Sequence, residues 1–432
     1  MITHIRMKNF KSWKDSGKVE LAPLTGFFGT NSSGKSSLLQ MLLLLKQTAD
    51  HPNLTEIIFF GDEKSLVNLG NFREVIHGHD LEATLELEFG WKIGTHLSIE
   101  TYLEDHFGAM EQVSFTTDDF TFNASILGKN DKLVVENKPY RVKFENKEQV
   151  VSEGSYSNKI YGEAFGFEAT LENSPIPLIS SEFKKLFDSV YYLGPNRVHP
   201  QREYHWSDKD PRDVGLWGDK VIDALLCAHM RRVKISKKGE AVTIEDRISE
   251  WLREMNLAYS FSLEPIGALK DDNYEVRIQK SATSPAVTLT DIGYGLSDLL
   301  PMLVLCYYTP EGSILILEQP GIHLHPMAQA QLADLFLEVI AERNLQILVE
   351  SHSEHLLTRL QRRIAEKQID QDDVALYFCR NTDGESTIER LQVTESGDIK
   401  NWPENFFGDV MGDMFAMTDK QGERLNDQDP EG

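Results

Sequence analysis

The chain has 432 residues, of which 41% are hydrophobic and 26% charged, a composition typical of globular proteins. No apolar run approaches the roughly 18 residues that span a bilayer, and Met1 to Phe10 lack the apolar core of a signal peptide. Three distant cysteines match no zinc or redox spacing. We therefore expect a cytoplasmic protein without a membrane segment.

The net charge of −24 disfavours nucleic acid as a general partner, because phosphate binding needs clustered Lys and Arg. One basic stretch, at residues 231–238, makes local DNA contact possible. The same stretch also fits a solvated helix end, so DNA binding is not indicated by charge.

The N-terminal residues predict a strand at Ile2–Met7 and a second strand at Thr25–Phe28. A glycine-rich loop at residues 29–34 and a helix at Gly34–Ala49 follow. From residue 82 to 145 apolar and polar residues alternate. Period-two alternation bounded by turn residues predicts half-buried antiparallel strands. The alternating apolar positions are Leu85, Leu87 and Phe89, then Val113 and Phe115, Leu133 and Val135, and Val142 and Phe144.

The rest of the chain alternates between helices and short apolar strands. This pattern predicts an α/β fold with a parallel sheet covered on both faces. The predicted elements are a strand at Val190–Leu193, helices at Val221–Arg232 and from a Thr243–Asp246 cap onward, a helix at Ser297–Tyr307, a strand at Ile314–Leu317, a helix at Met327–Arg343, a strand at Gln346–Val349 and a helix at Glu354–Lys367. The polar tail from Gln421 onward is expected to be disordered.

The loop before the first helix fits the phosphate-binding pattern G-x-x-x-x-G-K-[ST], and a bare glycine-rich turn is the alternative. Backbone N–H groups of such a loop surround a phosphate, and the helix N-terminus faces the same group. We expect Lys35 to reach the β- and γ-phosphates of ATP and Ser36 to bind Mg²⁺. The expected nucleotide-binding residues are Gly29, Thr30, Asn31, Ser32, Ser33, Gly34, Lys35, Ser36 and Ser37.

A second acidic group is expected at the end of a neighbouring buried strand, where ligands collect in open α/β sheets. Glu318 follows the apolar run Ile314–Leu317, and we assign it to Mg²⁺. A glutamate that caps the following segment before Pro320 is the alternative.

His352 ends the next predicted strand and is expected to hydrogen-bond the γ-phosphate. Two other interpretations stay open. His352 and His355 could bind a metal with His323 and His325, although no Cys or carboxylate cluster completes such a site, or His352 could be structural.

These motifs stand in an order that resembles the ABC-type ATPase heads of the SMC, RecF and OLD superfamily. Residues 5–13 are similar to the first strand of these heads and its basic turn, residues 318–326 to their Walker B motif and D-loop, and residues 350–353 to their histidine switch. Residues 291–298 stand where their signature motif lies. Residues 192–197 and 401–407 are similar to a bacterial group of single-domain OLD-like ATPases with a short C-terminal module, often found near phage-defence genes.

The resemblance implies an ABC-ATPase head with a mixed P-loop sheet, an antiparallel β subdomain and a short helical insertion. It divides the chain into an N-terminal ATPase lobe (1–200), an insertion (201–285), a C-terminal ATPase lobe (286–368), a C-terminal module (369–420) and a tail (421–432). It also implies a homodimer in which Gly295 and Ser297 of one subunit cap the nucleotide of the other. Those residues also suit a tight turn that opens a helix.

Departures from the family pattern narrow the function. No long coiled coil fits between the lobes, and too few residues follow position 368 for a nuclease domain. Gln319 occupies the place of the usual catalytic glutamate, and it orients water without accepting a proton. We expect slow ATP hydrolysis with Glu318, Gln319 and His352 in catalytic roles; if hydrolysis is normal, Glu350 is the nearest other base.

The expected function is a slow ATPase that closes as a nucleotide-sandwiched dimer and regulates or senses a protein partner, plausibly in anti-phage defence. One alternative is an ATP-stabilised scaffold, without hydrolysis, for a nuclease or toxin. Another is a DNA-repair ATPase similar to RecF, which the acidic charge disfavours.

Overall fold

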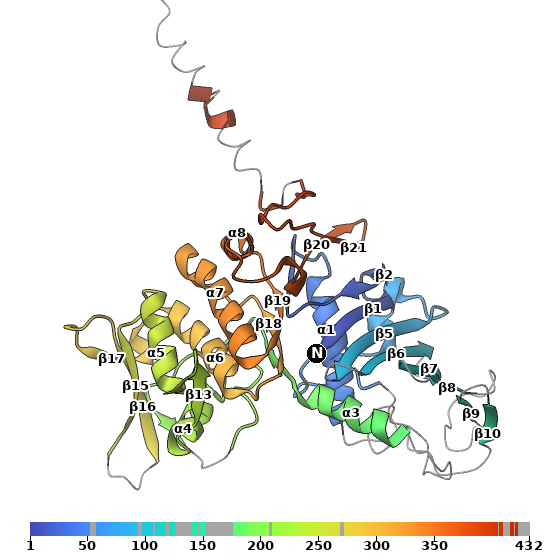
Figure 1. Ribbon diagram of the computed structural model, residues 1–432, viewed down its shortest axis with the longest axis horizontal. Helices are drawn as coiled ribbons and strands as arrows, with labels where there is room; N and C mark the ends of the chain where they lie inside the picture. Colours follow the sequence, from blue (N-terminus) through green and yellow to red (C-terminus); the bar gives the residue numbers. More distant parts are fainter. Residues whose placement is uncertain are drawn as a thin grey trace, which may run out of the picture.

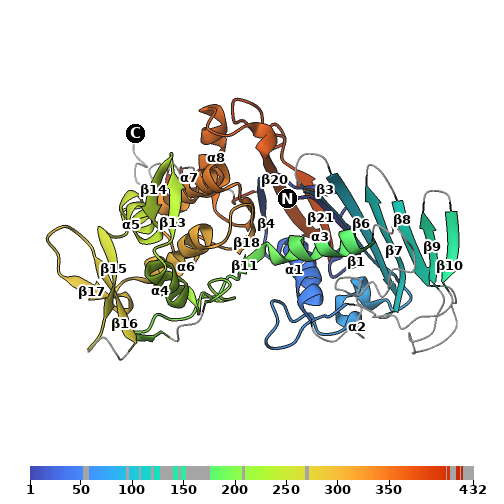
Figure 2. The same ribbon diagram turned by 60° about the horizontal axis from the view of Figure 1, so that its bottom comes forward.

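The computed structural model describes residues 1–51, 58–93, 97–106, 109–117, 121–126, 140–144, 147–151, 176–206, 210–267, 272–404, 406–408, 415–418 and 420–421. A central sheet separates two lobes (Figure 1). The strands β5–β8 lie at one end of the molecule and the elements α5 and β15–β17 at the other, in both views (Figure 2). Within the described residues, no helix is both long and apolar enough to cross a bilayer.

The central sheet has six strands in the order β11-β18-β19-β4-β20-β21. The first five run parallel and the last antiparallel, so the predicted parallel sheet is confirmed within a mixed one. The strands are β11 (Val190–Leu193), β18 (Ile314–Glu318), β19 (Gln346–Glu350), β4 (Leu24–Gly29), β20 (Val374–Thr382) and β21 (Glu385–Arg390).

Every residue of β4, β11, β18 and β19 is buried, because helices or strands cover both faces of this sheet. Successive side chains of a strand point to opposite faces. Leu315 and Leu317 accordingly join one hydrophobic core with the helices α4–α8, whereas Ile314 and Ile316 join a second core with α1 and the N-terminal lobe. The continuous apolar runs in the sequence reflect this burial on both sides.

The N-terminal lobe contains an antiparallel sheet with nine strands among the described residues. Leu85, Leu87 and Phe89 are buried on one face of β5, as their alternation predicted, and the pairs in β7 and β9 also lie in strands. Leu133 and Val135 lie outside the described residues. The strands are β1 (Ile2–Phe10), β2 (Trp13–Asp15), β3 (Val19–Glu20), β5 (Leu85–Ile93), β6 (Leu97–His106), β7 (Ala109–Thr117), β8 (Thr121–Ile126), β9 (Tyr140–Phe144) and β10 (Lys147–Val151).

Two small sheets accompany the helices of the other lobe. They comprise β12 (Tyr204–His205), β15 (Ser260–Pro265), β16 (Asn273–Gln279) and β17 (Ala286–Thr288) in one, and β13 (Lys234–Lys237) and β14 (Glu240–Thr243) in the other. Among the described residues, the labelled α-helices are α1 (Lys35–Asp50), α2 (Phe72–Val75), α3 (Ile176–Asp188), α4 (Val221–Met230), α5 (Ile244–Glu254), α6 (Tyr294–Tyr308), α7 (Pro326–Arg343) and α8 (Glu354–Ala365). Residues 415–418 and 420–421 are also helical, and short 3-10 turns lie at His77–His79, Leu289–Asp291 and Gln371–Asp373.

Helix starts follow the capping chemistry of the sequence. The Thr243 hydroxyl accepts a hydrogen bond from the Asp246 N–H and donates one to the Asp246 carboxylate, as the Thr-x-x-Asp pattern predicted. The predicted start of α6 at Ser297 was wrong by one turn. The helix begins at Tyr294 because Gly293, in an extended conformation, forms its N-terminal boundary.

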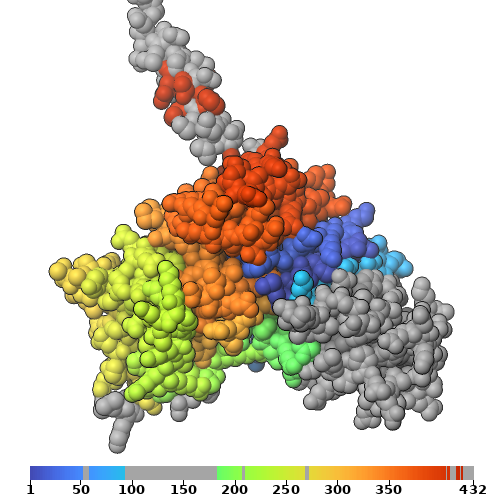
Figure 3. Space-filling model, viewed as in Figure 1, coloured from blue at the N-terminus to red at the C-terminus, as the bar shows by residue number. Residues whose placement is uncertain are grey.

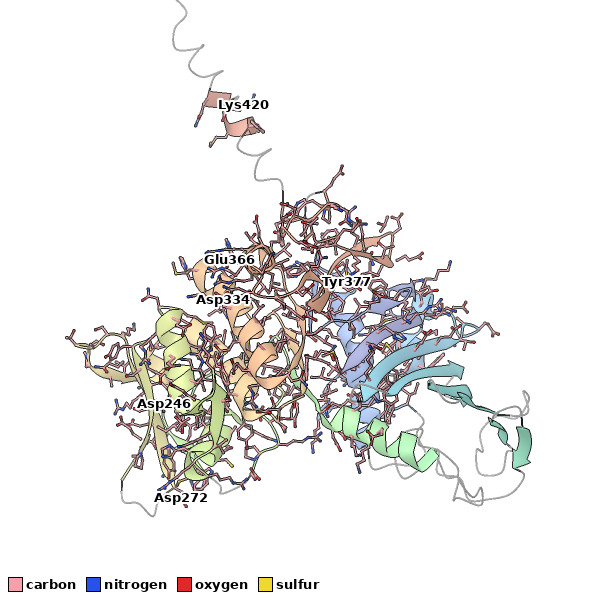
Figure 4. The ribbon with its side chains drawn as sticks, in the orientation of Figure 1. Asp246, Asp272, Asp334, Glu366, Tyr377 and Lys420 are labelled. Atoms are coloured by element: carbon pink, nitrogen blue, oxygen red, sulfur yellow. The ribbon has the colours of Figure 1, made fainter. Side chains whose placement is uncertain are left out.

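The strands β20 and β21 were not predicted, although β20 is central to the fold. It pairs with β4, the strand that leads into the P-loop, over six residues from Val374 to Cys379. Tyr377, labelled in Figure 4, stacks on Phe27 of β4 at 5.8 Å and donates a hydrogen bond to the Glu20 carbonyl. The C-terminal residues, orange and red in Figure 3, accordingly lie against the blue N-terminal residues.

Candidate functional site

The P-loop connects β4 to α1 through three residues with positive φ angles, Gly29 (137°), Ser32 (58°) and Gly34 (87°). Glycine is required at the first because an added Cβ would lie 2.1 Å from the Cys379 carbonyl oxygen. At Gly34 a Cβ would lie 2.6 Å from the Ser386 hydroxyl. The first turn of α1 contains no acidic residue and no side-chain cap, so its N–H groups and dipole are available to an anion.

A pocket of about 590 Å³ opens beside this loop. Its lining is polar and comes from the loop, the first turns of α1, the turn after β1 and the ends of β18 and β19. The lining residues are Lys11, Ser12, Asn31, Ser32, Ser33, Gly34, Lys35, Ser36, Ser37, Gln40, Gln319, Glu350 and His352. Most of the predicted nucleotide-binding residues therefore meet in one cavity.

Lys35 is 3% exposed, and its ammonium group points back into the loop. It donates hydrogen bonds to the carbonyl oxygens of Thr30 (2.6 Å) and Gly29 (3.3 Å) and to the Ser33 hydroxyl (3.3 Å). Burial lowers the pKa of Lys35, and the charge of Glu350 opposes this. A buried ammonium without a directly paired carboxylate is well suited to the negative charge of phosphate.

Two buried carboxylates lie side by side at the edge of the sheet. Glu318 and Glu350 are register partners at the ends of β18 and β19. The Ser36 hydroxyl donates to Glu350 at 2.7 Å, and the Tyr192 hydroxyl donates to Glu318 at 2.9 Å. Glu350 lines the pocket, whereas Glu318, the predicted magnesium ligand, is not among the lining residues.

Burial raises the pKa of Glu318 to about 7, and the neighbouring Glu350 charge adds to the rise. Burial also raises the pKa of Glu350, while hydrogen bonds from Ser36 and Gln319 oppose that change. Two like charges held together in a poorly solvated place favour a divalent cation between them. The side-chain oxygens of Ser36, Glu318 and Glu350 therefore fit Mg²⁺. The sequence predicted Ser36 and Glu318 as magnesium ligands, and Glu350 adds a third.

Gln319 and His352 both line the pocket. Gln319 has a φ of 49°, which is unusual for a residue with a side chain, and its N–H donates to the Glu350 carbonyl at 3.0 Å. Burial, followed by the charge of Lys35, lowers the pKa of His352, which favours a neutral ring. Both residues are positioned to contact a ligand in the pocket.

The predicted signature residues lie elsewhere. Gly295 and Ser297 are in the first turn of α6, and Ser297 lines a separate cavity of about 320 Å³. The Ser297 hydroxyl donates to the Tyr294 carbonyl at 2.9 Å and is mostly buried. Tyr294, in the same turn, is 62% exposed. These residues are therefore outside the P-loop pocket of their own chain.

Two of the four histidines considered as metal ligands, His323 and His325, have other partners. His323 pairs with Asp298 of α6, and the His325 ring accepts a hydrogen bond from the Met327 N–H at the start of α7. No group of three or more His, Cys, Asp or Glu side chains within the described ranges could hold a metal ion.

A second hollow of about 550 Å³ lies on the other side of the P-loop. Gly29, Thr30 and Asn31 form one wall, residues 352–355 another, and Phe406 and Phe407 a third. Phe406 packs on Phe28 and Phe378 with ring centroids 6.1 and 4.6 Å apart. Ser386 of β21 also holds Ser12 through two hydrogen bonds, so the C-terminal residues contribute to the nucleotide pocket.

The sequence prediction gave Glu350 only as an alternative base, and it did not place Lys11 and Ser12 in the pocket or Tyr192 beside Glu318. Glu350 stands two residues before His352, so its place at a strand end was the available signal. Tyr192 gave no comparable signal, because its hydrogen bond to Glu318 spans 126 positions of the chain.

Two family profiles match parts of this chain. The profile of a family described as AAA ATPase domain matches residues 1–357, and that of a protein of unknown function (DUF3696) matches residues 369–417. The search of curated proteins finds no match.

Solved structures similar to this chain include three SMC heads. A crystal structure of the SmcHead bound to the C-winged helix domain of ScpA has 11% identity and a TM-score of 0.47, covering 91% of this chain and 98% of that one. The SMC head domain from Thermotoga maritima has 12% identity and a TM-score of 0.42, with 91% and 99% covered. A Pyrococcus furiosus Smc head with an extended coiled coil, bound to the C-terminal domain of ScpA, has 11% identity and a TM-score of 0.39, with 90% and 96% covered.

Proposed function

The chain belongs to the AAA ATPase domain family, and on that premise we propose that it binds Mg-ATP, hydrolyses it slowly and closes as a dimer around two nucleotides. The observation that carries this proposal is the meeting of the P-loop with two buried carboxylates. Ser36 and Glu350 are 314 positions apart in the chain, yet their side chains are hydrogen-bonded within the pocket that Lys35 lines.

Each group has a role in holding the nucleotide. Residues 29–34 and the N-terminus of α1 direct N–H groups at the phosphates, and Lys35 supplies a positive charge to the β- and γ-phosphates. Ser36, Glu318 and Glu350 hold magnesium, which when bound neutralises phosphate charge. Lys11 and Ser12 line the same pocket and are available to the rest of the nucleotide.

Hydrolysis is slow in this proposal because the residue that faces the attacking water is Gln319. Its amide orients water but accepts no proton, and general base catalysis typically contributes about 10²–10⁴-fold. Glu350, hydrogen-bonded to both Ser36 and Gln319, is the only carboxylate among the lining residues described. It serves as the base if turnover proves fast.

Dimer closure is supported by where the signature residues lie. Gly295 and Ser297 are outside the pocket of their own chain, so they act on a nucleotide only in a second copy. Exposed apolar side chains near them, Tyr294 (62%), Ile322 (57%) and Met327 (58%), suit a surface that a second copy covers.

The closed dimer in turn regulates or senses a protein partner in anti-phage defence, as the resemblance of residues 192–197 and 401–407 implies. A scaffold that binds ATP without hydrolysis, for a nuclease or toxin, is the second candidate, and Gln319 is the residue that favours it.

Two measurements test the proposal. Calorimetric titration with Mg-ATP should show binding that depends on Lys35, and phosphate release from saturating Mg-ATP should be measurable but slow. No binding would refute the function, whereas binding with no release would favour the scaffold. Salt-sensitive DNA binding with ATP-dependent affinity would support the RecF-like alternative instead.

A further inference from the structure

Gln319 and His352, which both line the P-loop pocket, stand on loops that leave neighbouring strands. Gln319 begins the turn 319–325 directly after β18, and His352 lies in the loop 351–353 after β19. The two strands pair in parallel as far as Glu318 and Glu350. The Gln319 N–H donates to the Glu350 carbonyl at 3.0 Å and so joins the two segments at their base. Beyond this bond both segments leave the sheet, so other contacts set the distance between them.

The side chain of Gln329, near the start of α7, supplies such a contact. Its Oε1 accepts a 2.6 Å hydrogen bond from the hydroxyl of Ser353, the residue next to His352. Its Nε2 donates a 2.9 Å hydrogen bond to the Leu324 carbonyl, in the turn that begins at Gln319. One amide group therefore ties the loop after β19 to the turn after β18.

The turn 319–325 is closed by its own hydrogen bonds. The Gln319 carbonyl accepts from the Ile322 N–H at 3.3 Å, and the Gly321 carbonyl accepts from the N–H of Leu324 at 3.1 Å. A Cβ at Gly321 would lie 3.3 Å from Cγ of Gln329, so the turn packs directly on the same side chain that bonds its far end. Through these contacts the position of Leu324 constrains that of Gln319.

The loop 351–353 is held at the same hydroxyl. Besides its bond to Gln329, the Ser353 hydroxyl accepts from the Leu356 N–H at 3.1 Å and so caps the start of α8. The Ser353 N–H donates to the Ser351 hydroxyl at 3.0 Å. His352 therefore stands between two serines whose hydroxyls are both engaged, and the bond to Gln329 links this loop to α7.

We propose that Gln329 is a positioning residue that holds Gln319 and His352 at a fixed separation around the γ-phosphate of ATP. The inference rests on the proposed function, in which Gln319 orients the attacking water and His352 contacts the γ-phosphate. Groups held in place before a ligand binds lose less conformational freedom on binding, so they stabilise that ligand more strongly. Gln329 acts through the two residues that it braces and does not itself contact the phosphate.

Calorimetric titration of the full chain with two nucleotides tests this role without relying on hydrolysis. The probes are Mg-ADP and Mg-AMP-PNP, a non-hydrolysable analogue with a γ-phosphate, at a protein concentration where sedimentation shows a monomer. Wild type should bind the analogue about tenfold more tightly than ADP. Gln329→Leu keeps a side chain of similar size and removes both hydrogen bonds. It should lower the affinity for the analogue about fivefold or more and leave that for ADP within about twofold.

Gln331→Leu is the matched control. Gln331 stands on the same helix, its amide donates to the Glu254 carbonyl at 2.7 Å, and it is not among the residues that line the pocket. Both affinities of this variant should equal those of wild type. Gln329→Leu with both affinities lowered equally, or with neither lowered, would overturn the positioning role. No binding of ADP by wild type would instead refute the proposed function, and the positioning role with it.

Further variants test whether Gln329 acts through the residues it braces. In a Gln319→Ala/His352→Ala background, Gln329→Leu should change the affinity for the analogue by less than about twofold, because neither positioned side chain remains. A further fivefold loss there would overturn the proposal. Ser353→Ala should reproduce the loss seen in Gln329→Leu, whereas Ser353→Thr, which retains the hydroxyl, should bind both nucleotides as wild type does. Equal losses in the two Ser353 variants would contradict the role of this hydrogen bond.

Discussion

The hydroxyl of Ser36 donates a 2.7 Å hydrogen bond to Oε2 of Glu350. Ser36 opens α1 directly after the P-loop lysine, and Glu350 ends the strand β19, which pairs with β4. The bond joins the phosphate-binding loop to the acidic edge of the sheet. Both residues supply oxygen ligands of the type that Mg²⁺ prefers, so the same contact is the natural place for the cation.

Removal of the P-loop charge should abolish tight nucleotide binding. Lys35→Ala is expected to weaken Mg-ATP binding at least tenfold, about 1.4 kcal/mol or more, because it removes the buried ammonium of the P-loop that serves the β/γ-phosphates in this proposal. Lys14→Ala, which removes an exposed lysine of β2, is the control and should leave the affinity unchanged. Equal affinities of wild type and Lys35→Ala in calorimetry would contradict the P-loop assignment.

The residue at position 319 should set the hydrolysis rate. Gln319→Glu supplies a base beside the attacking water and is expected to speed single-turnover phosphate release by about 10²-fold or more. Glu350→Gln should weaken Mg²⁺ binding, since it removes a cation ligand. Three results together would identify Glu350 as the base instead. Wild type would release phosphate fast, Gln319→Glu would release it more slowly, and Glu350→Gln would release none at saturating Mg²⁺.

ATP should drive dimer formation through the exposed first turn of α6. Ser297 is mostly buried, so a large residue there would disturb folding, whereas Tyr294 is 62% exposed. Tyr294→Asp is expected to lower the dimer fraction with Mg-ATP at least fivefold while the monomer melts at the same temperature. Sedimentation velocity measures both states. A dimer fraction that does not change with ATP in wild type would show a constitutive assembly or a monomer.

Mg²⁺ binding should depend on pH through Glu318. Its pKa is raised to about 7, so the charged form that binds a cation grows from about a tenth at pH 6 to about nine-tenths at pH 8. The Mg²⁺-dependent gain in ADP affinity should rise roughly tenfold over that range.

The pH dependence of folding should have the opposite sign in metal-free protein. A carboxyl with a raised pKa favours the folded state when protonated, so this contribution to stability falls as pH rises from about 4.5 through 7. Glu318→Gln should flatten both pH profiles. The ionisation of the nucleotide itself affects wild type and variant equally, so the comparison between them removes it. A variant with the same Mg²⁺ profile as wild type would exclude Glu318 as the titrating ligand.

The C-terminal residues should be needed for folding of the ATPase itself. A chain ending at residue 368 lacks β20 and leaves an edge of β4 unpaired beside the P-loop, so it is expected to aggregate or to lose ATP binding. A chain ending at Gly408 keeps β20, β21 and the Phe406 contacts, and it should bind ATP within twofold of the full chain. Circular dichroism and calorimetry compare them. A folded, nucleotide-binding 1–368 chain would contradict this dependence.

Local chemistry determined much of this protein. Four residues close together in the sequence specify the P-loop: the glycines at 29 and 34, Lys35 and Ser36. The positive φ angles and the free N–H groups of the loop depend on such sequence neighbours. The run Ile314–Leu317 specifies a strand buried on both sides, and Thr243 specifies where α5 begins. The strands β4, β11, β18 and β19 of the central sheet could be placed for the same reason, whereas β20 and β21 were not predicted.

Only the tertiary structure decided which of these elements meet. The position of β20 beside β4, the hydrogen bond between Ser36 and Glu350, and that between Tyr192 and Glu318 join segments far apart in the sequence. Strand order is set by how the two cores pack on opposite faces of the sheet, and a residue pattern along one segment does not contain that information. The sequence therefore specified the phosphate-binding groups, whereas packing decided which carboxylates stand beside them.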